Sequence, residues 1–389
     1  MLTQIINGRI LTPQGWLADG SVLVSDGKIL EVTNSDMAII GAEIVDAKGM
    51  NIVPGFVSMH AHGGGGHDFT EATPEAFKAA VHAHLIHGST TVIPTLSSTT
   101  FDVLKQAASV CEGIMSEPNS PVVGLHIEGP YLSPRMAGME WKDYLKNPDP
   151  NEYIPLVEST NCILRWDISP ELPGSHEFAQ YMKSKGILTA ITHTEAEYDE
   201  IKSAYESGFT HAAHFYNAMP GFHKRREYKY EGTVESVYLM DNMSVEIIAD
   251  GVHLPATIIK LVYKLKGVEK TCLVTDALKY AACGDNVPDD PRYIIVDGVC
   301  KLADGITIAG SIATCDMLVK IAVKRAGIPL EDAVRMASET PAKILGINDR
   351  KGSLERGKDA DILIIDSKAN VRCVFQAGKI VEGTNTMIH

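Results

Sequence analysis

The chain has 389 residues, of which 45% are hydrophobic and 22% charged, proportions typical of a folded globular protein and far from a disordered one. Its 35 lysine and arginine residues against 49 aspartate and glutamate residues give a formal net charge of −14, which argues against a general nucleic-acid-binding protein. No apolar stretch reaches the length of about 18 residues that a membrane span needs, and the N-terminal residues do not resemble a secretory signal. The cysteines are scattered without a CxxC pair, so we expect a reduced, cytoplasmic protein without a membrane segment.

The first 50 residues alternate apolar and polar positions between short turns. The turn dipeptides are Asn-Gly at 7–8 and Asp-Gly at 19–20 and 26–27, which are typical of β-hairpins. Residues 358–383 have the same character, and neither end is long enough to build a hydrophobic core alone. We therefore predict one small β-sandwich domain built from both termini, residues 1–51 and 351–389.

In the central part, apolar β-rich runs alternate with amphipathic helical patterns. The runs are 52–60, 91–96, 122–128, 163–169, 188–193, 211–216, 245–250 and 271–276. The helical patterns are 74–88, 101–115, 175–186, 195–208, 255–266, 314–326 and 330–345. Such alternation indicates a parallel sheet, and eight units in about 250 residues are the count of a (β/α)8 barrel. We predict an α/β fold with a TIM barrel over residues 52–350; an open, doubly wound sheet is the alternative.

The first apolar run ends in His60-Ala61-His62, followed by four glycines. Residues two apart on a strand point to the same face, so these two imidazoles could form half of a metal site. The alternative is a pair of ordinary polar histidines before a flexible turn. His82 and His84 have the same spacing but lie in a helical pattern, where positions two apart diverge by about 200°. We interpret that second pair as structural or solvated.

Polar residues also stand at the ends of later runs, and a barrel enzyme keeps its active site at the carboxyl ends of its strands. Singly, each could equally be a capping group or a hydrogen-bonded core residue. They are Glu128, His193, His214 and Asp276. With the first histidine pair they form a set that suits a divalent transition metal such as Zn or Fe. The set is large enough for one ion, or for two that share Glu128 as a bridge.

These motifs resemble the amidohydrolase superfamily and, more narrowly, the N-acetylglucosamine-6-phosphate deacetylase family. The resemblance runs along the whole chain. It is carried by EGPYLSP at 128–134, HFYNAMP at 214–220, IADGVH at 248–253, LVTDA at 273–277, AGS at 309–311 and GSLERGKDADI at 352–362. No lysine occurs in 162–170, so a carboxylated lysine bridge, as in urease-like relatives, is not expected.

The resemblance implies hydrolysis of the acetamide of N-acetylglucosamine-6-phosphate to glucosamine-6-phosphate and acetate by a metal-activated water. It also implies the metal ligands and the acid/base. Glu128, His193 and His214 would hold the main metal, His60 and His62 a second metal that some members lack, and Asp276 would be the catalytic acid/base beside the metal.

The resemblance further implies the contacts to the sugar phosphate and a homodimer. The contacts would be Asn217, Ala218 through its backbone, His253 and Arg226, with the arginine reaching across the dimer interface. Arg226 ends the densest basic run of an acidic chain, His223-Lys224-Arg225-Arg226, and a phosphate needs fixed cations. The alternative for this run is a solvated surface patch.

Two segments depart from the family pattern. Gly138-Met139-Glu140 stands where the family has a Gly-small-His sequence, and 226–232 is longer than its family counterpart and lacks the Pro-Gly. These changes affect the sugar and phosphate contacts and leave the metal ligands intact. N-acetylgalactosamine-6-phosphate or another N-acylated substrate therefore stays an alternative. The motifs also leave open a different metal amidohydrolase, such as an isoaspartyl dipeptidase or a cyclic-amide hydrolase, and a non-catalytic paralogue, which would usually have lost a ligand or Asp276.

Overall fold

The computed structural model describes residues 2–35, 39–138, 142–284 and 290–384. Its centre is a sheet of eight parallel strands that follow one another in chain order. They are β6 (Phe56–Ala61), β9 (Ser89–Leu96), β10 (Leu125–Glu128), β11 (Ile163–Ile168), β12 (Leu188–Ile191), β13 (Phe209–Ala212), β16 (Ser244–Ile248) and β17 (Thr271–Val274). All eight match apolar runs of the sequence, because strands covered on both faces are nearly continuously apolar.

The last strand returns to the first and closes the sheet into a barrel. The backbone N–H of Asp276 donates to the carbonyl of His60 at 3.0 Å, and that of His62 donates to the carbonyl of Ala277 at 2.8 Å. The predicted (β/α)8 fold is therefore confirmed, and the open-sheet alternative is wrong because its outer strands would not meet.

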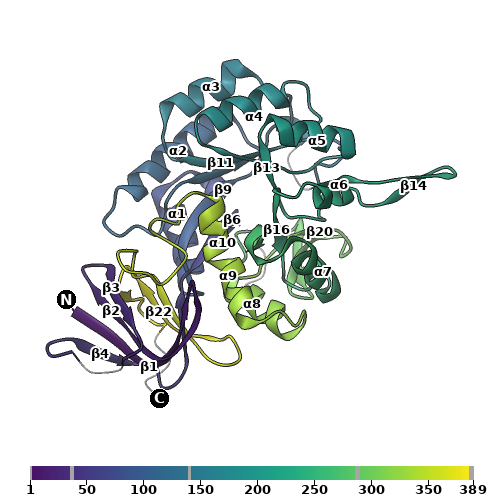
Figure 1. Cartoon of the computed structure of the whole chain (residues 1–389). Coiled ribbons are helices and arrows are strands. Elements are labelled where there is room, and N and C mark those ends of the chain that lie inside the picture. Colours follow the sequence, from purple (N-terminus) through teal and green to yellow (C-terminus); the bar gives the residue numbers. More distant parts are fainter. Residues whose placement is uncertain (1, 36–38, 139–141, 285–289, 385–389) are drawn as a thin grey trace.

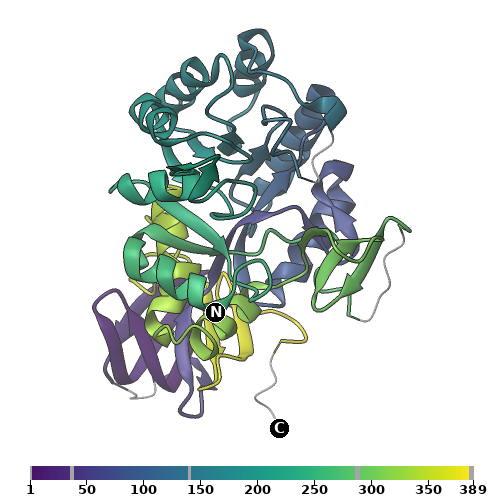
Figure 2. The ribbon, with the colours of Figure 1, turned by 90° about the vertical axis from the view of Figure 1, so that its right-hand side faces the viewer.

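Helices surround the barrel (Figures 1 and 2). They are α1 (Pro74–Leu85), α2 (Phe101–Met115), α3 (Pro150–Ser159), α4 (Ser175–Ser184), α5 (Tyr198–Ser207), α6 (Thr233–Leu239), α7 (Ala256–Lys266), α8 (Cys315–Lys324), α9 (Leu330–Ala337) and α10 (Glu339–Ile344). Threonine side chains begin two of them: Thr73 accepts from Ala76 N, and Thr100 from Val103 N. The helix expected over 330–345 is two helices, because Ser338 leaves the helical conformation at φ −136° and ψ −75°.

Both ends of the chain form a second eight-stranded sheet (Figure 1, purple and yellow). Its strands are β1 (Leu2–Thr12), β2 (Gly15–Ser25), β3 (Lys28–Thr33), β4 (Glu43–Asp46), β5 (Asn51–Pro54), β21 (Ile362–Ile365), β22 (Val371–Gln376) and β23 (Lys379–Ile380). The backbone N–H of Ile29 donates to the carbonyl of Lys358 at 2.9 Å, so β3 meets the segment before β21. The sheet encloses its own core of residues such as Ile5, Val22 and Phe375. A small β-domain made of both termini is thus present, and its division from the barrel at residues 51 and 351 stays a prediction.

The run expected as one strand over 52–60 is divided between the two sheets. β5 pairs with β1 and β21, whereas β6 begins the barrel. Gly55 stands between them, and a Cβ atom added there would lie 2.0 Å from Oγ1 of Thr90. Only glycine allows the chain to pass this close to its neighbour.

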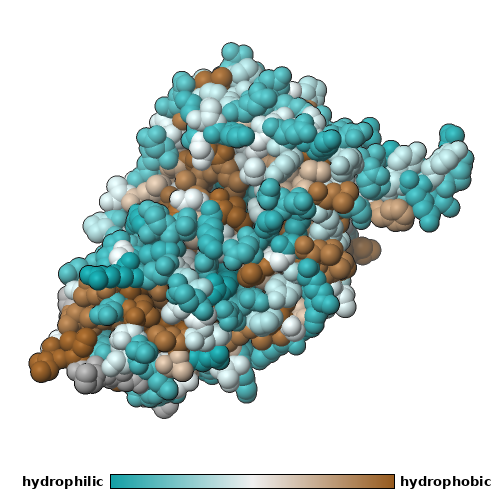
Figure 3. All heavy atoms as spheres, viewed as in Figure 1, coloured by the Kyte–Doolittle hydropathy of each residue, from teal (hydrophilic) through white to brown (hydrophobic). Residues whose placement is uncertain are grey.

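Two antiparallel insertions were not expected from the sequence. After β17, the strands β18 (Tyr293–Val296), β19 (Val299–Leu302) and β20 (Ile308–Ser311) form a small sheet that bridges back to the barrel at Ala277. After β13, β14 (His223–Arg225) and β15 (Tyr228–Tyr230) form a hairpin that projects from the body (Figure 1) and ends in a hydrophilic surface (Figure 3). Short β7 (Gly63–Gly64) and β8 (His67–Asp68) follow β6.

Across the residues described, no helix has the length and apolar character needed to cross a membrane.

Candidate active site

The carboxyl ends of the barrel strands surround a cavity of about 500 Å³. Most of the residues that the sequence indicated line it: His62, Glu128, His193, His214, Asn217, Ala218, His253 and Asp276. His60 lies at its floor with a fully buried side chain. The β18–β20 insertion contributes Tyr293, Ile308 and Gly310 to the wall. Strand-end placement therefore brought together residues that are more than 200 positions apart in the sequence.

Two groups of ligand-type side chains meet in this cavity, each with its ligating atoms within 4.8 Å of one another: His60, His62 and Asp276, and Glu128, His193 and His214. In the first group, Oδ1 of Asp276 lies 3.1 Å from Nε2 of His62 and 3.3 Å from Nε2 of His60. The carboxylate thus closes the triangle that the two imidazoles of β6 begin.

Glu128 stands between the two groups. Its Oε2 lies 3.3 Å from Nε2 of His60 and 3.2 Å from Nε2 of His62. Its Oε1 lies 3.4 Å from Nε2 of His193 and 3.0 Å from Nε2 of His214. One oxygen therefore faces each group, which is the arrangement of a bridging carboxylate.

All four imidazoles direct Nε2 toward the centre, because Nδ1 has a partner outside it. Nδ1 of His60 lies 2.6 Å from Glu246 Oε1, and Nδ1 of His62 lies 2.9 Å from Ser97 Oγ. Backbone carbonyls serve the other two: Nδ1 of His193 donates to Met136 O at 2.7 Å, and Nδ1 of His214 to Asn217 O at 3.2 Å. Outer hydrogen bonds of this kind orient metal-binding histidines.

The donor set fits a divalent cation. Four ligands at 2.0–2.1 Å from a tetrahedral ion are separated by about 3.4 Å, close to the spacings between these nitrogen and oxygen atoms. Imidazole and carboxylate ligands suit Zn²⁺, Fe²⁺ and similar ions. The cavity therefore has ligands for one ion, or for two with Glu128 between them.

The close packing of carboxylates and imidazoles shifts their proton affinities. Burial by itself lowers the pKa of His60, but the negative charges of Glu246, Asp276 and Glu128 outweigh it and raise this pKa to about 10. Burial opposes ionisation of Glu128 and Asp276 as well, yet the surrounding imidazoles hold the pKa of both carboxyls well below the usual range. Both carboxylates are therefore ionised at neutral pH, as metal ligands and a general base must be.

Several of these residues have unusual backbone conformations. The φ angles of His193, His214 and Asp276 are 43°, 26° and 47°, and that of Ala218 is 51°. Non-glycine residues with positive φ are costly and cluster at functional sites. The chain thus turns sharply at three of the candidate ligands, a signal that only the structure provides.

Most but not all of the residues predicted to contact the substrate line the cavity. Asn217, Ala218 and His253 line the cavity, and Nδ1 of His253 lies 2.6 Å from Asp250 Oδ2. Arg226 does not line it, because it occupies the turn between β14 and β15 at the end of the projecting hairpin. Arg135 lines the cavity instead, with a side chain that is 82% exposed, and no pattern in the sequence had singled it out.

The remaining sequence features have simpler places. His82 is exposed and therefore solvated, whereas Nε2 of buried His84 lies 2.8 Å from Gly63 O, so His84 is structural. Gly138 lines the cavity, whereas Met139 and Glu140 of the departing segment lie outside the described residues.

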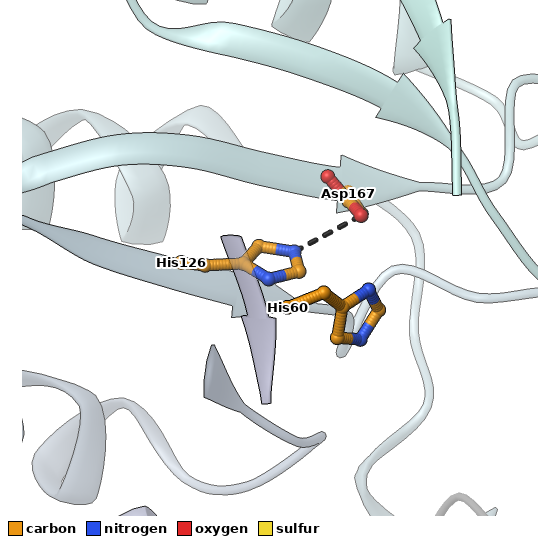
Figure 4. Close-up of side chains that lie close together, drawn as sticks. All are labelled: His60, His126 and Asp167. Atoms are coloured by element: carbon orange, nitrogen blue, oxygen red, sulfur yellow. Dashed lines mark ion pairs between the residues drawn. The ribbon is translucent and has the colours of Figure 1, made fainter. Parts of the chain in front are cut away.

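A further group lies below the site inside the barrel, where Nε2 of His126 is 3.0 Å from Asp167 Oδ2 and its ring meets that of His60 edge-on at 4.7 Å (Figure 4).

Comparison with known proteins agrees with this geometry. The model of the amidohydrolase family matches residues 51–381. An N-acetylglucosamine-6-phosphate deacetylase of Haemophilus influenzae is 30% identical, over 97% of this chain and 98% of its own. An N-acetylgalactosamine-6-phosphate deacetylase of Escherichia coli O157:H7 is 29% identical, over 97% and 99%. The crystal structure of N-acetylglucosamine-6-phosphate deacetylase from Pasteurella multocida is 28% identical, with a TM-score of 0.91 over 98% of this chain and 100% of that one. The chain therefore belongs to the amidohydrolase family and, within it, to the N-acetylglucosamine-6-phosphate deacetylase family.

Proposed function

We propose that the protein hydrolyses the acetamide of N-acetylglucosamine-6-phosphate to glucosamine-6-phosphate and acetate. The observation that carries this proposal is Glu128, whose two oxygens face two separate groups of ligand side chains at the floor of the cavity. Asp276 lies beside them at the carboxyl end of the barrel. The full-length similarity to deacetylases of this substrate supports the choice of reaction.

For the metal, we assign Glu128, His193 and His214 to one ion, and His60, His62 and Asp276 to a second. When bound, a divalent cation such as Zn²⁺ or Fe²⁺ polarises the amide carbonyl and lowers the pKa of water from about 15.7 toward about 7. The chain's own contribution is to hold the four imidazoles with Nε2 inward and both carboxylates ionised. The site is therefore preorganised.

Asp276 is the group that moves the proton. Its side chain is 17% exposed and faces the cavity, whereas Glu128 is 2% exposed. The amine of an amide leaves poorly until it is protonated. Asp276 accepts a proton from the attacking water as its oxygen bonds to the carbonyl carbon, and then donates that proton to the nitrogen as the C–N bond breaks. The products are acetate and the free amine.

Asn217, Ala218 and His253 are the contacts for the sugar phosphate in the same subunit, and Arg135 provides an exposed cation at the cavity. Arg226 lies on a hairpin that projects from the body of the molecule and does not line its own cavity, so we assign it to the phosphate of a second copy in a homodimer. We place this dimer in the cytoplasm, where the seven scattered cysteines of each chain would stay reduced.

An acetate-release assay tests the proposal, with N-acetylglucosamine-6-phosphate, N-acetylgalactosamine-6-phosphate and unphosphorylated N-acetylglucosamine as substrates, each with and without added Zn²⁺ or Fe²⁺. We expect metal-dependent release with the highest kcat/KM for N-acetylglucosamine-6-phosphate. A higher value for the galactosamine isomer would favour the second candidate, which the E. coli relative and the departing 226–232 segment support. No acetate from any of the three would reject both.

A further inference from the structure

A buried cluster of charges lies directly beneath the ligand residues. Arg165 and Asp167 of β11 and Glu246 of β16 are each 0% exposed. The guanidinium of Arg165 donates to Asp167 at 2.8 and 2.5 Å and to Glu246 at 2.5 and 2.9 Å. Removing so many charges from water is costly, and buried ion pairs are a weak source of stability. The position of this cluster under the site suggests a further role.

Glu246 is the member of the cluster that contacts two ligand residues. Its Oε1 lies 2.6 Å from Nδ1 of His60 on β6, which is separated from β16 by β17 in the closed barrel. The same oxygen accepts the backbone N–H of His214 at 3.2 Å, and the carbonyl of Glu246 accepts that of Phe215 at 2.7 Å. One residue thus holds the ring of a ligand on β6 and the backbone of a ligand after β13.

The contact with His60 selects one form of its imidazole. A neutral imidazole that presents the Nε2 lone pair to a cation must carry its hydrogen on Nδ1. An ionised carboxylate only accepts hydrogen bonds, so Glu246 at 2.6 Å stabilises this form. The partners of His62 and His214 are a hydroxyl and a backbone carbonyl, which are neutral. A charged partner also makes a ligand nitrogen more basic.

The contact with His214 supports a strained backbone. The φ angle of His214 is 26°, which a non-glycine residue adopts only when its surroundings hold it there. The two hydrogen bonds from His214 and Phe215 to Glu246 supply part of that restraint. Arg165 in turn fixes the carboxylate from below, so Glu246 has little freedom to rotate.

We infer that Glu246 is a positioning residue, held by Arg165, that sets the Nδ1–H form of His60 and the backbone of His214 so that the two ligand groups face one another. This inference rests on the metal site proposed above. The simpler explanation is that Glu246 serves only as a counter-ion for Arg165. The two explanations differ in what they require: a counter-ion needs only a negative charge near Arg165, whereas a positioning residue must also reach His60.

Two substitutions separate these roles. Glu246→Asp keeps the charge beside Arg165 but shortens the side chain by one methylene, so it no longer reaches His60. Glu246→Gln keeps the length but removes the charge. Asp167→Asn is the matched control, because it removes the other carboxylate bound to Arg165, which contacts His126 rather than a proposed ligand. Circular dichroism and thermal unfolding of the metal-free proteins establish that each variant is folded.

The main measurement is the number of metal equivalents retained per chain during titration with Zn²⁺, read by elemental analysis after equilibrium dialysis. We expect two equivalents in the wild type and in Asp167→Asn. In Glu246→Asp and Glu246→Gln we expect the weaker site to lose about 10- to 100-fold in affinity, the usual effect of removing an outer partner of a metal ligand. Unchanged affinity in Glu246→Asp, whether or not Glu246→Gln is affected, or equal losses in all three variants, would overturn the inference.

A second measurement reads the hydrogen position in the wild-type protein and needs no Glu246 variant. Long-range ¹H–¹⁵N spectra of the wild-type metal-loaded protein, with His60 assigned by comparison with His60→Gln, report which ring nitrogen carries the hydrogen. We expect it on Nδ1, and a hydrogen on Nε2 would overturn the inference. If the wild type never binds more than one equivalent, the metal assignment of His60 and His62 fails and the role of Glu246 fails with it. If the wild type binds two equivalents and the metal affinity of the Glu246 variants is unchanged, only the inference about Glu246 is refuted and the metal assignment stands.

Discussion

Oδ1 of Asp276 lies 3.1 Å from Nε2 of His62, although the two residues come from opposite ends of the barrel sequence. The contact exists because β17 closes against β6, so the residue after the last strand faces the residue after the first. Asp276, the proposed acid/base, therefore lies in direct contact with His60 and His62, the proposed ligand pair.

This closeness predicts the effect of Asp276→Asn. The amide keeps the size of the side chain but accepts no proton at neutral pH, so we expect kcat to fall by about 10²- to 10⁴-fold, the usual contribution of a general acid/base. The ion assigned to Glu128, His193 and His214 should stay bound. Acetate release and metal content, measured on the same preparation, check both statements, and a near-normal kcat would contradict the role of Asp276.

Metal content gives a second prediction. His62→Ala removes one ligand from the group with His60 and Asp276, so we expect a fall from two equivalents to one while the other group stays filled. His82→Ala is the control, since His82 has the same sequence spacing but is exposed on α1. Chelator treatment should abolish acetate release, and added divalent metal should restore it. Equal metal loss in the two variants would contradict the ligand role of His62.

Arg226 predicts complementation between subunits. With Arg226→Ala, we expect KM to rise at least about tenfold for the phosphorylated sugar, as loss of a charge-assisted contact implies, and little for the neutral one. If the arginine serves the partner's cavity, a mixed dimer of Arg226→Ala and Asp276→Asn contains one complete site. Mixing equal amounts of the two variants after reversible dissociation should recover about a quarter of the wild-type sites, or half in purified mixed dimers, measured at substrate concentrations far below the KM of the wild type. No recovery in confirmed mixed dimers would place Arg226 in its own subunit's site or outside both.

Replacing two glycines by alanine should change the stability of the protein in opposite directions: Gly55 lies between β5 and β6, and Gly113 lies in α2. Gly55→Ala puts a Cβ atom 2.0 Å from Thr90 Oγ1, so we expect a loss of about 1–3 kcal/mol in the free energy of unfolding, as overpacking usually causes. Gly113→Ala, within α2, meets no atom within 4 Å and should instead gain about 0.5–1 kcal/mol. Urea unfolding of both variants, metal-free, measures the difference. A neutral Gly55→Ala would contradict the close approach.

The barrel and the proposed ligands could be predicted from the sequence because they follow simple periodic rules. Eight buried strands appear as apolar runs, and His62 or Asp276 stands out as the polar residue that ends a run. The break between α9 and α10 at Ser338 could not be predicted, because nothing in the sequence pattern of 330–345 indicates the local change in φ.

Glu246 was missed for a different reason. It lies in the middle of an apolar run, and its proposed role depends on its contact with Nδ1 of His60, 186 positions away in the sequence. Arg165 is hidden in the same way within β11. The β18–β20 sheet was missed because its exposed strands lack a clear alternation, although its Tyr293 and Gly310 line the cavity. Contacts across the barrel and its insertions are set by tertiary structure, which no local window of sequence contains.

The division of one apolar run into β5 and β6 has a consequence for biosynthesis. β6 ends in His60, and β5, immediately before it, is paired on one side with β21, which begins only at Ile362. The anchor of the first ligand strand is therefore incomplete until nearly the whole chain has left the ribosome. Contacts between such distant segments form late and slowly. The proposed metal centre should accordingly assemble only after translation ends, and a chain truncated before β21 should bind a divalent cation poorly even though it contains every proposed ligand.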